Sequence, residues 1–128
     1  MSTILLVEDD FDLRGIITVM LHEVYGYDVT SVPSGHEGYA VFLGNPSAFD
    51  LILSDFHMLG MDGNTLRNRV NSHCDDEGIP RPAFLIMSGA WSPAVGGDND
   101  GVQFIAKPFE GQNLHAKIQQ LLEGRKVV

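Results

Sequence analysis

The stretch Ile4-Leu5-Leu6-Val7-Glu8-Asp9-Asp10 joins a continuous apolar run directly to three acidic residues. A strand that is buried on both faces has this kind of sequence, and such strands belong to parallel sheets. The arrangement recurs at Leu51-Ile52-Leu53-Ser54, which is followed at once by Asp55. The two segments therefore predict two buried strands of a parallel sheet, each ending at a carboxylate.

The rest of the chain alternates between helical and strand patterns. Apolar residues between positions 11 and 24 recur at helical spacing, with Asp10 or Asp12 as the cap and Gly26 as the stop. Five alternations of strand and helix predict an α/β fold with helices on both faces of the sheet. The remaining expected strands are 28–32, 83–87 and 102–106, and the remaining expected helices are 35–43, 66–74 and 114–122.

One segment does not follow this alternation. Between Ser88 and Val102, where a fourth helix is due, the sequence is rich in Gly, Asp, Asn and Pro. These residues are unfavourable inside helices, proline by about 3 kcal/mol relative to alanine. We therefore expect the fourth helix to be short, frayed or absent.

Composition and charge narrow the class of protein. The chain has 128 residues, of which 44% are hydrophobic and 20% charged, and this is typical of one globular domain. The net charge of -9 argues against direct binding to nucleic acid or to anionic membranes. Cys74 is the single cysteine, so no internal disulfide can form. The apolar run 4–7 is too short for a membrane span, and we expect a soluble cytoplasmic protein.

Ligands of open α/β sheets bind at the carboxyl ends of the strands. This rule places Glu8, Asp9, Asp55, Ser88 and Lys107 on one edge of the predicted sheet. Each close pair of charged carboxylates costs about 4 kcal/mol at an effective dielectric near 20, so either a proton or a cation is needed among them. Oxygen ligands of this kind suit magnesium.

The same residues allow phosphoryl chemistry. Asp55 can act as a nucleophile toward phosphorus, Lys107 can supply positive charge, and Ser88 can donate a hydrogen bond to a phosphoryl oxygen. A structural interpretation is open as well. The acids would then cap the helices that follow them, and Lys107 would make an ordinary salt bridge.

Four segments together resemble the receiver domain of response regulators in two-component signalling. They are the first acidic stretch, the segment from Asp55 to Gly63, the segment Met87-Ser88-Gly89-Ala90, and Lys107-Pro108-Phe109. The resemblance spans nearly the whole chain, with the motifs in the family's order. It implies a single flavodoxin-like (βα)5 receiver domain over residues 1–128, with a five-stranded parallel sheet in the order 2-1-3-4-5.

The resemblance also implies a role for each matching residue. Asp55 matches the phosphoacceptor. Glu8, Asp9, Asp55 and the backbone carbonyl of His57 match the magnesium ligands, with Asp9 the more direct ligand of the acidic pair. No other cofactor is implied.

A second group matches the residues that respond to the phosphoryl group. Ser88 and Phe104 match the switch positions, and Lys107 matches the lysine before a proline, a bond that the family often holds in cis. Leu59 differs from the family, which usually has proline there, and Phe104 lacks the phenol of a tyrosine.

The family mechanism implies a histidine kinase or histidine phosphotransfer protein as donor and a further protein as downstream partner. The domain would catalyse its own phosphorylation and dephosphorylation without being an enzyme for other substrates. One alternative is a pseudo-receiver that only binds proteins, which Leu59 and the weak fourth helix favour. Another is a magnesium-dependent phosphatase, but such enzymes carry a second acid two residues after the nucleophile, where this chain has His57.

Overall fold

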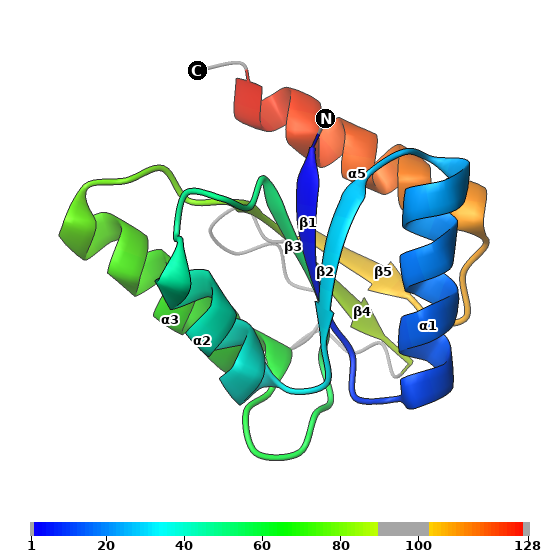
Figure 1. Cartoon of the computed structure of the whole chain (residues 1–128), viewed down its shortest axis with the longest axis horizontal. Coiled ribbons are helices and arrows are strands. Elements are labelled where there is room, and N and C mark those ends of the chain that lie inside the picture. Colours follow the sequence, from blue (N-terminus) through cyan, green and yellow to red (C-terminus); the bar gives the residue numbers. More distant parts are fainter. Residues whose placement is uncertain (1, 90–102, 127–128) are drawn as a thin grey trace.

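The computed structural model describes residues 2–89 and 103–126. Its centre is a parallel sheet of five strands in the order β2-β1-β3-β4-β5, as expected (Figure 1). The two acid-ended segments form β1 and β3, which are hydrogen-bonded neighbours. The strands are β1 Thr3–Val7, β2 Asp28–Val32, β3 Leu51–Asp55, β4 Ala83–Ser88 and β5 Gln103–Ala106.

Helices cover both faces of this sheet. Figure 1 shows α2 and α3 on one face, with α1 and α5 on the other. The expected fourth helix falls within residues 90–102, outside the described residues. None of the helices that the structure describes is long and apolar enough to cross a membrane. The helices are α1 Phe11–Val19, the π-helical turn η1 Met20–Val24 that continues it, α2 Gly35–Gly44, α3 Gly63–Glu77 and α5 Gly111–Lys126.

The two central strands divide their side chains between two apolar cores. Leu5 and Ile52 pack in the core beneath α2 and α3, whereas Leu6 and Leu53 pack in the core beneath α1 and α5. Successive residues of a strand point to opposite faces, so continuous apolar runs are required in strands covered on both sides. Each fully buried leucine or isoleucine contributes roughly 1.5–3 kcal/mol, and these strands therefore anchor the fold.

The helical stripe predicted in the third helix is confirmed. Leu66, Val70 and Cys74 are all fully buried in α3. The first helix is different, because only Ile17 and Leu21 of its predicted apolar set are buried there. Positions 16 and 17 are about 100° apart on a helix, and here Ile17 faces the core while Ile16 faces solvent. Large apolar side chains are instead exposed along this helix, namely Phe11, Ile16, Val19 and Val24.

Two aspartates set where the helices at the site begin. Asp10 caps α1, its carboxylate accepting a hydrogen bond from the Leu13 amide at 3.0 Å, while Asp12 lies inside the first turn. Asp62 caps α3 in the same way. A Cβ atom on Gly63 would lie 2.8 Å from the carbonyl oxygen of Asp55, so α3 starts directly against the end of β3.

Candidate functional site

The ends of four strands meet at one edge of the sheet. Val7 pairs with Ser54, Asp55 pairs with Met87, and Ser88 pairs with Ala106. Glu8, Asp55, Ser88 and Lys107 therefore stand at neighbouring strand ends, as predicted from the sequence.

Three carboxylates gather at this edge. Glu8, Asp9 and Asp55 each place one carboxylate oxygen within 4.8 Å of the others. Glu8 is 0% exposed and Asp55 is 7% exposed, while Asp9 lies on the surface. Two of the acids are thus held in the protein and the third faces water, which leaves the cluster open on one side.

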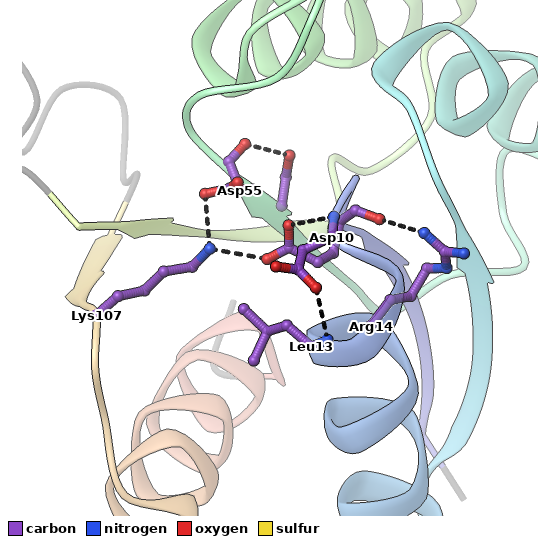
Figure 2. Close-up of polar contacts among 7 residues, drawn as sticks. Asp10, Leu13, Arg14, Asp55 and Lys107 are labelled. Carbon is purple, nitrogen blue, oxygen red and sulfur yellow. Dashed lines mark hydrogen bonds and ion pairs between the residues drawn. The ribbon is translucent and has the colours of Figure 1, made fainter.

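Lys107 is shared between the two buried acids. Its Nζ lies 2.8 Å from Oε1 of Glu8 and 3.1 Å from Oδ1 of Asp55 (Figure 2). A single ammonium thus offsets part of the repulsion among the three carboxylates. The arrangement differs from an ordinary salt bridge, because the lysine links the ends of β1 and β3 from beyond the end of β5.

The local environment shifts the pKa of both partners. Burial raises the pKa of Glu8, outweighing the hydrogen bonds from Lys107 and from the Asp10 amide, which lower it. The negative charge of Asp55 raises it further. For Lys107, burial acts to lower the pKa, but the hydrogen bonds to Glu8 and Asp55 outweigh burial and raise it. Lys107 is therefore charged at neutral pH.

Further hydrogen bonds fix the backbone around the acids (Figure 2). The carboxylate of Glu8 accepts from the Asp10 amide at 3.2 Å, and the carbonyl of Glu8 accepts from Nη1 of Arg14 at 2.8 Å. Ser54 donates its hydroxyl to the carbonyl of Asp55 at 2.9 Å. The sequence interpretation missed Arg14 and Ser54, because contacts from a side chain to a backbone carbonyl leave no signal in residue spacing.

The other predicted residues surround this centre. Ser88 is buried at the end of β4, and its carbonyl accepts from the Lys107 amide at 2.8 Å. His57 is exposed and lines a hollow of about 500 Å³ that Asp9 also lines. Phe104 is half-buried and packs against the core beneath α2 and α3. The Lys107–Pro108 peptide bond is cis, as the resemblance implied.

An apolar surface begins beside this edge and runs along α1. We call Phe11, Ile16, Val19 and Val24 the α1 surface, and all four side chains are more than half exposed. They line a groove of about 810 Å³ together with residues of the same helix and Ser31. The guanidinium of Arg14 lies over the ring of Phe11, 5.5 Å from its centre. Three of these residues, Phe11, Ile16 and Val24, belong to the apolar set that recurs at helical spacing in the sequence, and the structure leaves them exposed.

Comparisons with known proteins agree with this geometry. The sequence model of the family described as "Response regulator receiver domain" matches residues 4–119. The response regulator receiver protein CpdR of Brucella abortus is 31% identical over 125 residues, covering 95% of this chain and 98% of CpdR. The crystal structure of the chemotaxis protein CheY4 of Vibrio cholerae is 25% identical, with a TM-score of 0.80 over 94% of this chain and 98% of that one.

Some relatives are much longer than this chain. The 3',5'-cyclic-nucleotide phosphodiesterase regA of Dictyostelium discoideum is 31% identical over 123 residues, which are 93% of this chain but 15% of regA. The likeness to regA is thus confined to a segment the size of a receiver domain.

Proposed function

Because this chain belongs to the response regulator receiver domain family, we propose that it accepts a phosphoryl group on Asp55 in a magnesium-dependent reaction. The observation that carries the proposal is the position of the Asp55 carboxylate. One of its oxygens is paired with Lys107 at 3.1 Å, and the carboxylates of Glu8 and Asp9 lie within 4.8 Å. A nucleophile, a fixed positive charge and a set of oxygen ligands thus share one edge of the sheet.

The donor atoms fit a magnesium ion. Among the described residues, neither the Asp9 carboxylate nor Oδ2 of Asp55 is engaged in a hydrogen bond or ion pair, so both are available as ligands. Both oxygens of Glu8 already accept hydrogen bonds, and Glu8 therefore contributes mainly negative charge. Magnesium prefers oxygen ligands and retains several waters, which suits a cluster open on one side. When bound, the ion would neutralise charge on the acids and on the phosphoryl oxygens.

The transfer itself is a displacement at phosphorus. An oxygen of the Asp55 carboxylate forms the new P–O bond while the P–N bond of a phosphohistidine donor breaks, and the imidazole nitrogen keeps the electron pair. The Lys107 ammonium and the Ser88 hydroxyl would stabilise negative charge on the phosphoryl oxygens. Water later attacks the same phosphorus, which releases phosphate and restores the carboxylate. The chain thus acts on itself and is not an enzyme for other substrates.

The partners follow from this chemistry. The donor is a histidine kinase or a histidine phosphotransfer protein, and the α1 surface beside the acceptor offers it a place to bind. Ser88 and Phe104 lie on β4 and β5. A conformational change on phosphorylation of Asp55 can therefore alter the surface near these strands, and a downstream protein can bind the altered surface.

An intact-mass measurement tests the proposal. Incubation with acetyl phosphate and Mg²⁺ should add one phosphoryl group to the wild type and none to Asp55→Asn. Asp28→Asn is a matched control, because Asp28 lies exposed in β2 and it should label as the wild type does. A chelator should abolish labelling. Labelling of Asp55→Asn would refute the assignment of the acceptor.

A pseudo-receiver that only binds proteins is the second candidate, and Leu59 favours it. This side chain is 92% exposed in the loop after β3, where the family usually has proline. A folded wild type that gains no mass and shows no change in melting temperature with beryllofluoride would support this candidate over phosphorylation.

A further inference from the structure

We propose that Arg14 is a positioning residue for the magnesium site, acting through the peptide unit that carries Asp9. The inference rests on the proposed function and deepens it. Arg14 lies in the second turn of α1, and its Nη1 reaches back to the carbonyl oxygen of Glu8 at 2.8 Å (Figure 2). The guanidinium touches none of the three carboxylates by any contact that the described residues show.

The contact matters because of what the Glu8 carbonyl is joined to. This carbonyl and the Asp9 nitrogen belong to one planar peptide unit, so holding its oxygen also fixes the direction in which the chain leaves toward the Asp9 Cα. The amide of Glu8 is hydrogen-bonded to Val32 at 3.1 Å, which holds the other side of the residue. Arg14 therefore restrains the side of Glu8 that leads to the metal ligand.

Asp9 depends on this restraint more than its neighbours do. Glu8 and Asp55 are buried and paired with Lys107, whereas the Asp9 side chain is exposed and has no hydrogen-bond partner among residues 2–89 and 103–126. Repulsion from the two buried acids acts to push Asp9 outward when no cation is present. No hydrogen bond to the Asp9 side chain from residues 2–89 and 103–126 opposes this displacement, so the restraint on Asp9 comes mainly from its backbone.

Arg14 is itself held in place. Its guanidinium lies 5.5 Å from the centre of the Phe11 ring, a cation–π contact that limits where the side chain can swing. Hydrogen bonds from a charged donor are stronger than neutral ones. Arg14 therefore holds the turn that follows β1 in a fixed position relative to α1.

The direction in which Mg²⁺ affinity changes when Arg14 is substituted distinguishes positioning from simple electrostatics. Removing a positive charge near a cation site should strengthen Mg²⁺ binding if charge alone matters. Loss of positioning should weaken binding, and loss of a residue that orients a metal ligand typically costs about 10–100-fold in affinity. A substitution that removes both the charge and the hydrogen bond thus gives opposite results under the two accounts.

The test is a Mg²⁺ titration of the full chain followed by backbone-amide NMR, without any phosphodonor. Arg14→Met keeps the aliphatic stem but has no donor, and we expect its Mg²⁺ affinity to fall by roughly 10-fold. Arg14→Lys keeps the charge and a hydrogen-bond donor group, and it should recover most of the affinity. Arg81→Met is the matched control, because Arg81 pairs with Asp75 at 2.6 Å and precedes β4, whose other end carries Ser88.

A second measurement distinguishes positioning from loss of folding. In acetyl phosphate labelling, Arg14→Met should need more Mg²⁺ for its half-maximal rate but reach nearly the wild-type plateau. If Arg14→Met does not fold, Arg14→Gln takes its place, because its shorter side chain cannot span the same distance. Mg²⁺ affinity in the folded variant that equals or exceeds that of the wild type would overturn the inference, as would an equal loss in Arg81→Met. A wild type that binds Mg²⁺ but accepts no phosphoryl group refutes the proposed function alone.

Discussion

Lys107 makes the most consequential contacts of any single side chain at the site. It holds a fully buried glutamate and a nearly buried aspartate at once, at 2.8 Å and 3.1 Å. Removing one partner of a buried charged group is costly because the others remain desolvated and uncompensated. The lysine is thus important for stability as well as for the proposed chemistry.

This gives a prediction about pH. The contacts with Glu8 and Asp55 raise the Lys107 pKa in the folded state above its ordinary value of 10.5. The stability that they provide is therefore fully present below pH 10.5 and is lost as the pH rises through the folded-state value. Without Mg²⁺, Lys107→Met should lower the free energy of unfolding by roughly 1–3 kcal/mol at pH 7, and this difference from the wild type should shrink above pH 10.5.

Urea unfolding at several pH values between 7 and 12 measures this difference. Lys117→Met is the control, since Lys117 lies on α5 and makes no ion pair with the three acids among the described residues. A difference that stays constant or grows in the alkaline range would contradict the prediction.

At the scale of single residues, the sequence predicted those whose position follows from a strand end. Asp9, Asp55 and Lys107 could be placed at one edge because parallel strands end together. Arg14 could not, because its role depends on a long side chain reaching back across a turn. The burial of Glu8 beside an exposed Asp9 was not predictable either, because the backbone turn that separates the two side chains is set by tertiary contacts.

At the scale of elements, the ends of the first helix were predictable but its buried face was not. The sequence offered Asp10 or Asp12 as the cap and Gly26 as the stop, and the structure has the cap at Asp10 and the end before Gly26. Helical spacing did not say which apolar residues face the core, because the helix has more of them than one core-facing stripe can hold. The apolar residues that do not fit this stripe form the α1 surface, which runs along the helix from the edge of the sheet that carries Asp55.

We expect this surface to contact the phosphodonor protein. A second copy of the chain is a less favourable partner, because each carries a net charge of -9. Ile16→Lys, at a side chain that is 64% exposed, should slow transfer from a histidine phosphotransfer protein that labels the wild type. The expected slowing is roughly 10-fold, which corresponds to a loss of about 1.4 kcal/mol of binding free energy. Labelling by acetyl phosphate should be unchanged.

Leu43→Lys is the matched control. Leu43 is a 41% exposed leucine on α2, at the opposite face of the sheet, and its replacement should leave protein-to-protein transfer intact. Equal slowing by both substitutions would count against a specific role for the α1 surface. A wild-type dimer in sedimentation experiments that Ile16→Lys dissociates would instead assign the surface to self-association.

At the scale of the whole molecule, the excess of negative charge links folding to cations. The three clustered carboxylates add local repulsion to the general repulsion of an acidic chain. An ion that binds only the folded state stabilises it in proportion to the logarithm of its concentration. Mg²⁺ at ten times its dissociation constant should therefore add about 1.4 kcal/mol and raise the melting temperature by a few degrees.

The control for this prediction is sodium chloride at matched ionic strength, which should raise the melting temperature much less. Asp9→Asn should lose most of the response to Mg²⁺ and Asp28→Asn should retain it. An equal response to both salts would mean that general screening, and not a site, explains the stabilisation.

The overall fold was largely predictable for a physical reason. Continuous apolar runs require burial on both faces, and alternation with helices then requires a parallel sheet. The strand order 2-1-3-4-5 came from the resemblance to receiver domains, since periodicity within single segments does not say which strands are neighbours. The register that places Asp55 beside Met87 required the structure itself.

The strand ends that carry Glu8 and Asp55 are buried, whereas much of α1 is exposed. This difference affects how the sequence can change during evolution. Glu8 and Asp55 are rooted in strands shared by both cores, whereas Phe11 and Ile16 are largely in water. Substitutions at Ile16, Val19 and Val24, which lie away from the contact between Arg14 and Glu8, can therefore accumulate without disturbing the ends of β1 and β3. Related chains can thus differ in the partners that bind α1 and keep the same arrangement of acids and lysine.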